Sequence, residues 1–298
     1  MTDRQPGHVW VDGRLLAAGE PHLSAFDRGF QLGDGVFVTL RARAGRPTEL
    51  PEHVARLGRS AAGLAIPLPD DVEGRLTGAI AALLAAEALD GPEGDASVRI
   101  TVSRGTFFGR GLLPPDEHPA PTIVVQAWPV SPVPAGHLEN GLHLVPSTVR
   151  RDPENPLSAL KTTSRADYVF ARVEAREAGA DDAIFLTTDG FLSEGTSANL
   201  FLVRGDELAT PSLACAILPR DDPRLDSPLG RRCRAADERG VADDPRAHRS
   251  RRGVPLEQRR RHPAGYPLRH PADRRRQPRP MDPPRSCRPR GVHRRRVE

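Results

Sequence analysis

Alternating apolar and polar residues mark the predicted strands in the first 128 residues of the chain. Residues 8–16 alternate around Asp12-Gly13, a pair typical of a tight hairpin turn. Runs rich in β-branched and other apolar residues predict further strands over 35–43, 97–103 and 122–128. The chain therefore opens with a β-rich pattern.

Two helices are predicted between these strands. Pro51 stands at a helix start, and the residues after it place Val54, Leu57 and Leu64 on one apolar face. An Ala- and Leu-rich stretch predicts a second helix over residues 71–89. We therefore expect residues 1–128 to form a small α/β domain.

A proline-rich segment, residues 129–136, predicts an interdomain connector. Residues 137–219 then predict the first part of a larger, β-rich domain. Its expected elements are a strand over 142–149, a helix over 163–178, a strand over 183–187, a turn at 189–190, and strands over 199–203 and 208–210. Hairpins rather than repeating βαβ units make up this pattern, so the expected fold class is a two-domain α+β protein.

Cysteine content and hydropathy exclude several classes of protein. The three cysteines, Cys215, Cys233 and Cys287, lie far apart and show no CxxC or Cys/His spacing, so we expect neither a disulfide framework nor a metal site. No basic-plus-apolar leader and no apolar run of about 18 residues is present. We therefore expect a cytoplasmic protein with no membrane partner.

Charge divides the chain into two parts. Residues 220–298 hold 24 Arg and 11 acidic residues, whereas residues 1–219 hold 19 basic and 28 acidic residues. The Arg- and Pro-rich tail has few apolar residues and no periodicity, so we expect it to be disordered. A nucleic-acid-binding tail is the alternative, but Tyr266 is its only Phe, Tyr or Trp, and we do not expect a nucleic-acid partner.

Lys161 is the only lysine in the chain. A general preference for Arg over Lys explains why lysines are rare, but it does not explain why this one remains. Arg has too high a pKa to act as a neutral amine nucleophile, so Schiff-base chemistry requires Lys. The single lysine is therefore a candidate catalytic residue.

Three stretches carry the candidate chemistry, and each has an ordinary structural alternative. Lys161 opens a Lys-Thr-Thr-Ser sequence at a predicted helix start, where a solvated lysine is common. Residues 194–199 read EGTSAN, which also suits a polar turn. Arg56 lies on the first predicted helix, where a surface arginine is the alternative. The three together are more specific than any one of them.

These stretches resemble the class IV, or fold-type IV, enzymes that use pyridoxal 5′-phosphate (PLP). That family includes branched-chain and D-amino acid aminotransferases and aminodeoxychorismate lyase. The matching text is DRGFQLGDGVF (27–37), EHVARL (52–57), VSRG (102–105), residues 160–203 and ELATPSLACAILP (207–219). The resemblance implies PLP as the cofactor, a two-domain fold and a homodimer.

The resemblance also implies roles for individual residues. Lys161 resembles the lysine that binds PLP as a Schiff base and moves the substrate Cα proton. Glu194 resembles the carboxylate that faces the pyridine nitrogen, and Arg56 resembles the arginine that binds the phosphate. The same resemblance places Thr196, Ser197 and Asn199 beside the cofactor, and Phe37 and Arg104 in the substrate pocket.

The implied reaction is transamination between an amino acid, of the branched-chain or D-amino acid type, and a 2-oxo acid. Two departures from the family pattern leave the substrate open. Val38 stands where many relatives have Glu, and residues 103–105 and 109–111 are more like those of the lyase or the D-amino acid enzymes. Aminodeoxychorismate lyase, which releases pyruvate and 4-aminobenzoate, is therefore the alternative activity.

The resemblance ends at Pro219. Relatives would continue with Gly-x-Thr-Arg and a helix whose N-terminus binds the phosphate, whereas this chain continues with RDDPR (220–224). Reading the codons one base forward permits Gly-Thr-Thr-Arg here and forces Trp at Met281-Asp282. We therefore hypothesise that residues 220–298 are a frameshift product. An inactive, truncated fragment of such an enzyme is accordingly a third interpretation of the chain.

Sequencing of the coding DNA tests the frameshift hypothesis. We expect a single-base insertion or deletion near codon 219 to restore Gly-Thr-Thr-Arg after Pro219, followed by an open frame. If no single-base change has that effect, the hypothesis is wrong.

Overall fold

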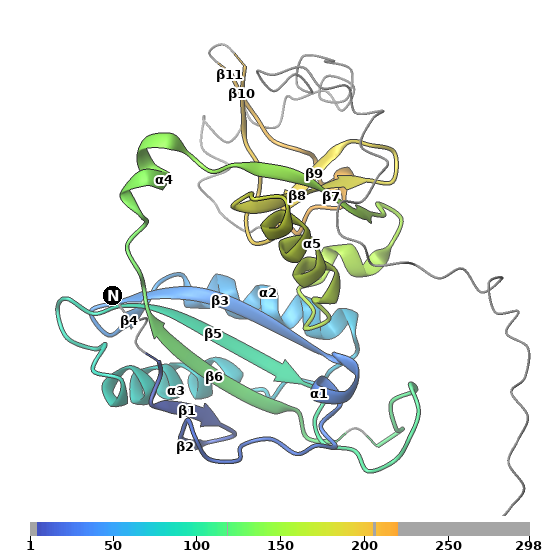
Figure 1. Ribbon diagram of the computed structural model, residues 1–298. Helices are drawn as coiled ribbons and strands as arrows, with labels where there is room; N and C mark the ends of the chain where they lie inside the picture. Colours follow the sequence, from blue (N-terminus) through green and yellow to red (C-terminus); the bar gives the residue numbers. More distant parts are fainter. Residues whose placement is uncertain (1–4, 118, 205–206, 220–298) are drawn as a thin grey trace, which may run out of the picture. The chain divides into compact units, whose positions relative to one another are not determined.

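The computed structural model describes residues 5–117, 119–204 and 207–219 (Figure 1). All of them lie within one unit of the chain, residues 1–248. The predicted tail, residues 220–298, and the frameshift hypothesis made for it lie outside the described residues. The domain boundaries at residues 128 and 137 stay predictions.

A six-stranded antiparallel sheet forms from the first 129 residues. Its strands are β1 (His8–Val11), β2 (Arg14–Ala17), β3 (Gly35–Arg43), β4 (Arg46–Pro47), β5 (Asp95–Ser103) and β6 (Thr122–Pro129). Their order across the sheet is β2-β1-β6-β5-β3-β4. The predicted hairpin and the three further predicted strands are therefore confirmed, with β4 added.

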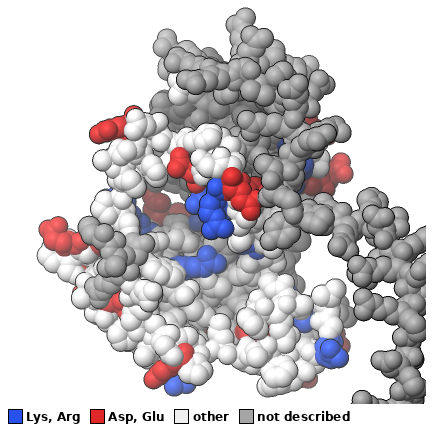
Figure 2. Space-filling view, viewed as in Figure 1, with Lys and Arg blue, Asp and Glu red and all other residues white. Residues whose placement is uncertain are grey.

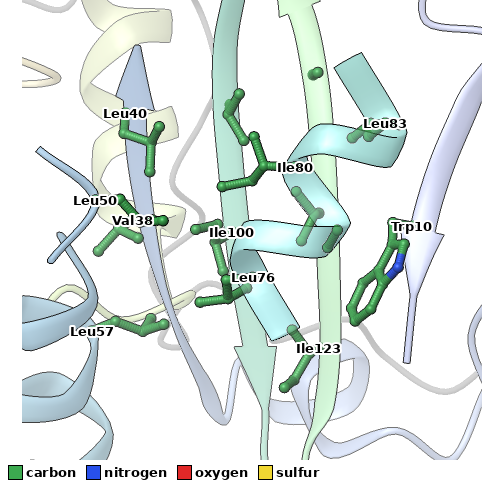
Figure 3. Packing of buried hydrophobic residues seen from close by; sticks show 14 of the residues in the cluster. Trp10, Val38, Leu40, Leu50, Leu57, Leu76, Ile80, Leu83, Ile100 and Ile123 are labelled. Carbon is green, nitrogen blue, oxygen red and sulfur yellow. The ribbon is translucent and has the colours of Figure 1, made fainter. Parts of the chain in front are cut away.

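Two helices, α2 (Leu50–Gly63) and α3 (Val72–Ala86), pack on one face of this sheet (Figures 1 and 3). On α2, Leu57 is fully buried, and Val54 and Leu64 pack beside it as predicted. On α3, the buried residues Leu76, Ala79, Ile80, Leu83 and Leu84 recur at the three- and four-residue spacing of a helix face. The core of this part of the molecule lies between the helices and the sheet.

Alternation along β3 divides its side chains between two environments. Val36, Val38 and Leu40 belong to the core beneath the helices. Phe37 and Thr39 lie on the opposite face, because successive side chains of a strand point to opposite sides. Both of these residues line the cavity that forms the candidate site.

The second part of the chain builds a smaller sheet. Its strands are β7 (Leu144–Arg151), β8 (Asp182–Thr187) and β9 (Leu192–Gly195), and α5 (Ala166–Glu177) packs on it. β7 and β8 are parallel and α5 connects them, so this part contains one βαβ unit in addition to the expected hairpins. A separate hairpin follows, formed by β10 (Leu202–Arg204) and β11 (Glu207–Ala209).

Several short elements were not predicted from the sequence. They are α1 (Arg28–Leu32), α4 (Ala135–Asn140) and two 3-10 turns, Pro156–Ala159 and Leu213–Cys215. Such elements are too short to show a hydrophobic period, and tertiary hydrogen bonds decide whether they form. One example is α1, whose N-cap Asp27 accepts hydrogen bonds from Ser103 and Thr122, residues distant in sequence.

None of the described helices is long and apolar enough to cross a membrane.

Removal of side-chain volume from the α3 core tests this packing. Leu83 is fully buried, so we expect Leu83→Ala to lower the free energy of unfolding by about 2–5 kcal/mol, measured by urea denaturation. Leu113 is 83% exposed, and Leu113→Ala is expected to change it by less than about 0.5 kcal/mol. Equal effects of the two substitutions would contradict the assignment of the core.

Candidate functional site

The segment that carries Lys161 is added to the open end of β3. The Phe37 N–H donates to the Lys161 carbonyl at 3.0 Å, and the Thr163 N–H donates to the Gly35 carbonyl at 2.8 Å. β4 pairs only with Ala42 and Arg43 at the far end of β3, so the edge near Gly35 is available. Lys161 therefore extends the six-stranded sheet, although it lies in the chain between β7 and β8 of the smaller one.

This pairing explains where α5 begins. Thr163 and Ser164 both donate side-chain hydrogen bonds to the Gly33 carbonyl, and Gly33 has the positive φ of 66° that ends α1. Residues held in this way are not free to join the helix. The helix therefore starts at Ala166 rather than at the predicted residue 163.

A cavity of about 640 Å³ lies beside Lys161. Its volume is in the range of small-molecule sites. Seven of the eight residues predicted for the cofactor and the substrate line it, namely Phe37, Arg56, Lys161, Glu194, Thr196, Ser197 and Asn199. Residues from both sheets contribute to these walls.

The eighth predicted residue, Arg104, lies elsewhere. Its guanidinium is buried, binds both carboxylate oxygens of Asp34, and donates to the carbonyls of Leu64 and Ala65. Arg104 does not line the cavity, because these contacts tie it to the end of α2. Its assignment to the substrate pocket stays a prediction.

Glu194 is a buried carboxylate with donors on both oxygens. The Tyr168 hydroxyl donates to Oε1 at 2.9 Å, and the Leu218 N–H donates to Oε2 at 3.0 Å. The Arg151 guanidinium lies 3.5 Å from Oε1. Glu194 is only 5% exposed, so these contacts rather than water fix the orientation of its carboxylate.

Tyr168 is kept in its protonated form as the donor to Glu194. Burial, followed by the negative charge of Glu194, raises the pKa of Tyr168 to about 12. Its ring also packs edge-on against Phe185 at 5.0 Å between centroids. At neutral pH the hydroxyl therefore holds the carboxylate in one orientation.

Three cations surround the ring of Phe37. The Arg99 Cζ lies 3.8 Å from the ring centroid, the Lys161 Nζ 4.8 Å and the Arg165 Cζ 5.3 Å. Burial and the nearby charge of Arg165 lower the pKa of Arg99. An aromatic face attracts cations, so Phe37 helps to hold like charges together in one cavity.

Arg56 and His53 form a pair on α2 at another wall of the cavity. The Arg56 Nη2 donates to the His53 Nδ1 at 2.9 Å. Burial, and then the positive charge of Arg56, lower the pKa of His53 to about 4, although Glu52 acts in the opposite direction. At neutral pH His53 is therefore an uncharged acceptor for the arginine.

Thr196 lines the cavity, but its hydroxyl donates to Asp182 at 2.6 Å. Asp182 in turn binds Arg172 at 2.9 Å. These contacts anchor the EGTSAN turn to β8 and α5. Ser197 and Asn199 of the same turn line the cavity as well.

Ten further residues line the cavity that were not among the predicted site residues, and they include His53, Arg99, Arg165 and Tyr168. Two of them left a signal in the sequence. Arg99 is a charged residue inside an apolar strand, and Tyr168 is one of only two tyrosines in the chain. Neither signal indicates which distant residues the side chain meets.

Charged residues of both signs gather on the face of the molecule shown in Figure 2. Basic side chains lie beside acidic ones near the middle of the view, and much of the described surface around them is uncharged. No group of three or more His, Cys, Asp or Glu among the described residues is arranged to hold a metal ion. The amine and the guanidinium groups of the cavity suit an organic anion, and the buried carboxylate accepts hydrogen bonds beside them.

Comparison with known proteins identifies the family. Residues 35–220 match the model of the class IV amino-transferases. The chain is 33% identical over 211 residues to a Methanocaldococcus jannaschii protein provisionally named a branched-chain-amino-acid aminotransferase, covering 70% of each. It is 31% identical to an aminodeoxychorismate lyase of Vibrio harveyi (68% of this chain, 70% of that one) and 29% identical to a D-alanine aminotransferase of Bacillus licheniformis (70% of each).

Solved structures show the same fold. The Escherichia coli branched-chain amino acid aminotransferase superposes with a TM-score of 0.67 at 23% identity, covering 76% of each chain. The PLP-bound form of a hypothetical aminotransferase from Mycobacterium tuberculosis gives a TM-score of 0.58 at 29% identity, covering 71% of this chain and 73% of that one. The chain therefore belongs to the class IV aminotransferase family of PLP-dependent transaminases and lyases, and it has their mixed α+β fold.

Proposed function

We propose that this protein binds PLP in the 640 Å³ cavity and moves an amino group between an amino acid and a 2-oxo acid. One observation carries the proposal. The only lysine of the chain lines the same cavity as a buried carboxylate and a guanidinium, which are the groups that PLP chemistry needs.

Lys161 supplies the amine that binds the cofactor and later holds the substrate proton. When PLP is bound, its ring accepts the electrons that remain on the substrate α-carbon after that proton leaves. The Lys161 Nζ takes the proton and returns it at the end of the half-reaction. Its backbone pairing with β3 keeps the amine at one place in the cavity while this happens.

Glu194 supplies a fixed negative charge. Tyr168 and Leu218 donate to its two oxygens, so the carboxylate is held in one orientation. In this orientation it would face the ring nitrogen of bound PLP and would favour a proton there. A buried charge acts strongly because little water screens it.

The guanidinium groups divide between the two anions of the reaction. Arg56, Ser197 and Asn199 line the cavity and would hold the cofactor phosphate. Arg99 and Arg165 lie together against Phe37 and provide positive charge for the substrate carboxylate. Substrates of the branched-chain or D-amino acid type both carry that carboxylate.

Two alternatives to transamination remain, a lyase activity and an inactive fragment. An aminodeoxychorismate lyase of Vibrio harveyi is among the similar proteins, and its substrate is also a carboxylate, so the same cavity supports release of pyruvate and 4-aminobenzoate. An inactive fragment is the second alternative, because the part of this chain that matches the family model ends at residue 220. A homodimer, as the resemblance implies, and a location in the cytoplasm, as the sequence analysis expects, belong to the same proposal.

Covalent capture of PLP tests the proposal directly. Incubation with PLP followed by borohydride reduction is expected to add the cofactor to the peptide that contains Lys161, as read by mass spectrometry. Lys161→Arg keeps the positive charge but removes the nucleophile, so it is expected to abolish this adduct. The N-terminal amine serves as an internal control, and a wild-type chain without an adduct at Lys161 contradicts the proposal.

The same preparation separates the activities. Amino transfer that requires a 2-oxo acid supports the transaminase, whereas pyruvate and 4-aminobenzoate formed from aminodeoxychorismate support the lyase. An adduct at Lys161 without turnover of either kind supports the inactive fragment.

His53 predicts a dependence of stability on pH. Its pKa is about 4 in the folded protein and 6.5 ordinarily, so the unfolded chain takes up a proton first as the pH falls. We expect the free energy of unfolding to fall by about 1–3 kcal/mol from this group between pH 6.5 and pH 4. The free energy of unfolding, measured by urea denaturation at each pH, should fall less steeply with falling pH in His53→Asn than in the wild type. His143 is exposed, and His143→Asn is the control that should leave this pH dependence unchanged.

A further inference from the structure

Both backbone polar groups of Lys161 are bound by the part of the chain that precedes it. Its carbonyl accepts the Phe37 N–H at 3.0 Å from β3. Its N–H donates to the Ser60 Oγ on α2 at 3.2 Å, and Ser60 is only 3% exposed. The first contact is main chain to main chain, whereas the second depends on one side-chain hydroxyl.

The same face of α2 carries Arg56. Residues four apart in a helix are neighbours on its surface, so Arg56 and Ser60 lie side by side on α2. Gly63, at the end of the same helix, lies close against Leu160. A Cβ added to Gly63 would be only 2.7 Å from a methyl group of Leu160. A single helix face thus holds Arg56 and also touches the two residues Leu160 and Lys161.

We propose that Ser60 is a positioning residue for Lys161. By accepting the Lys161 N–H, its hydroxyl sets the distance between the lysine and Arg56, so that one molecule can reach both. This inference rests on the proposed function, because it concerns the capture of PLP by Lys161. Without the hydroxyl, the part-buried Lys161 N–H loses this acceptor, and the main-chain bond to β3 no longer has a hydrogen bond from α2 beside it.

The single lysine makes the position of this residue measurable without catalytic turnover. The full chain is labelled with PLP and borohydride, and separately with acetic anhydride, which needs no phosphate site. For Ser60→Ala we expect the PLP concentration for half-maximal labelling of Lys161 to rise about tenfold, the size of one lost hydrogen bond to a part-buried group. The rate of acetylation should change by less than about twofold, because the amine itself remains accessible and nucleophilic.

Two variants serve as controls. Ser147 is 2% exposed and donates to Glu174 away from the cavity, so Ser147→Ala removes an equally buried serine hydroxyl and should leave both reactions at Lys161 unchanged. Ser60→Thr keeps a hydroxyl and should restore PLP labelling to within about threefold of the wild type. Hydrogen exchange of the Lys161 amide is expected to be faster in Ser60→Ala than in Ser147→Ala.

Each other outcome overturns the inference. Unchanged PLP labelling in Ser60→Ala shows that the hydroxyl does not position the lysine. An equal loss of PLP labelling and acetylation, or an equal loss in Ser147→Ala, shows that Ser60 only supports folding. If the wild type itself forms no PLP adduct at Lys161, the proposed function is wrong and this inference falls with it.

Discussion

Pairing of the Lys161 segment with the open end of β3 is the contact on which the candidate site depends. A strand edge leaves N–H and C=O groups without partners, and an added extended segment satisfies them. Here the added segment carries the only lysine of the chain, and its register is set by the bonds at Phe37 and Gly35. Because the next residues continue into α5 and the smaller sheet, this contact brings Glu194 and Arg56 to the same cavity.

Charge balance inside the cavity follows from that arrangement. Lys161, Arg99 and Arg165 surround Phe37, while Glu194 lies among Tyr168, Leu218 and Arg151. Each of these charged side chains is partly removed from water, so its electrostatic interactions are set mainly by its neighbours in the protein and less by solvent. The raised pKa of Tyr168 and the lowered pKa of His53 both have burial as their first cause. The wall residues therefore keep a neutral donor beside the carboxylate and a neutral acceptor beside Arg56.

The regular elements were predictable because their signal is local. Alternation identified β3, β5 and β6, and helical spacing identified α2 and α3. The start of α5 was predicted three residues too early, because Thr163 and Ser164 bind Gly33 and Gly35, which are distant in sequence. Arg104 illustrates the same limit for the site, since Asp34 and the end of α2 bind the side chain that the family pattern assigned to a pocket.

The sequence by itself determined the family and indicated which residues are candidates for its chemistry. A lone Lys161, followed by Glu194 in EGTSAN and preceded by Arg56 in EHVARL, identifies reactive groups because few residue types can do their work. Only the tertiary structure decided which neighbours tune them, among them Tyr168 at Glu194, His53 at Arg56 and Ser60 at Lys161. The physical reason is that residue identity fixes what a group is able to do, whereas its orientation and protonation depend on burial and on partners that can lie more than 100 positions away.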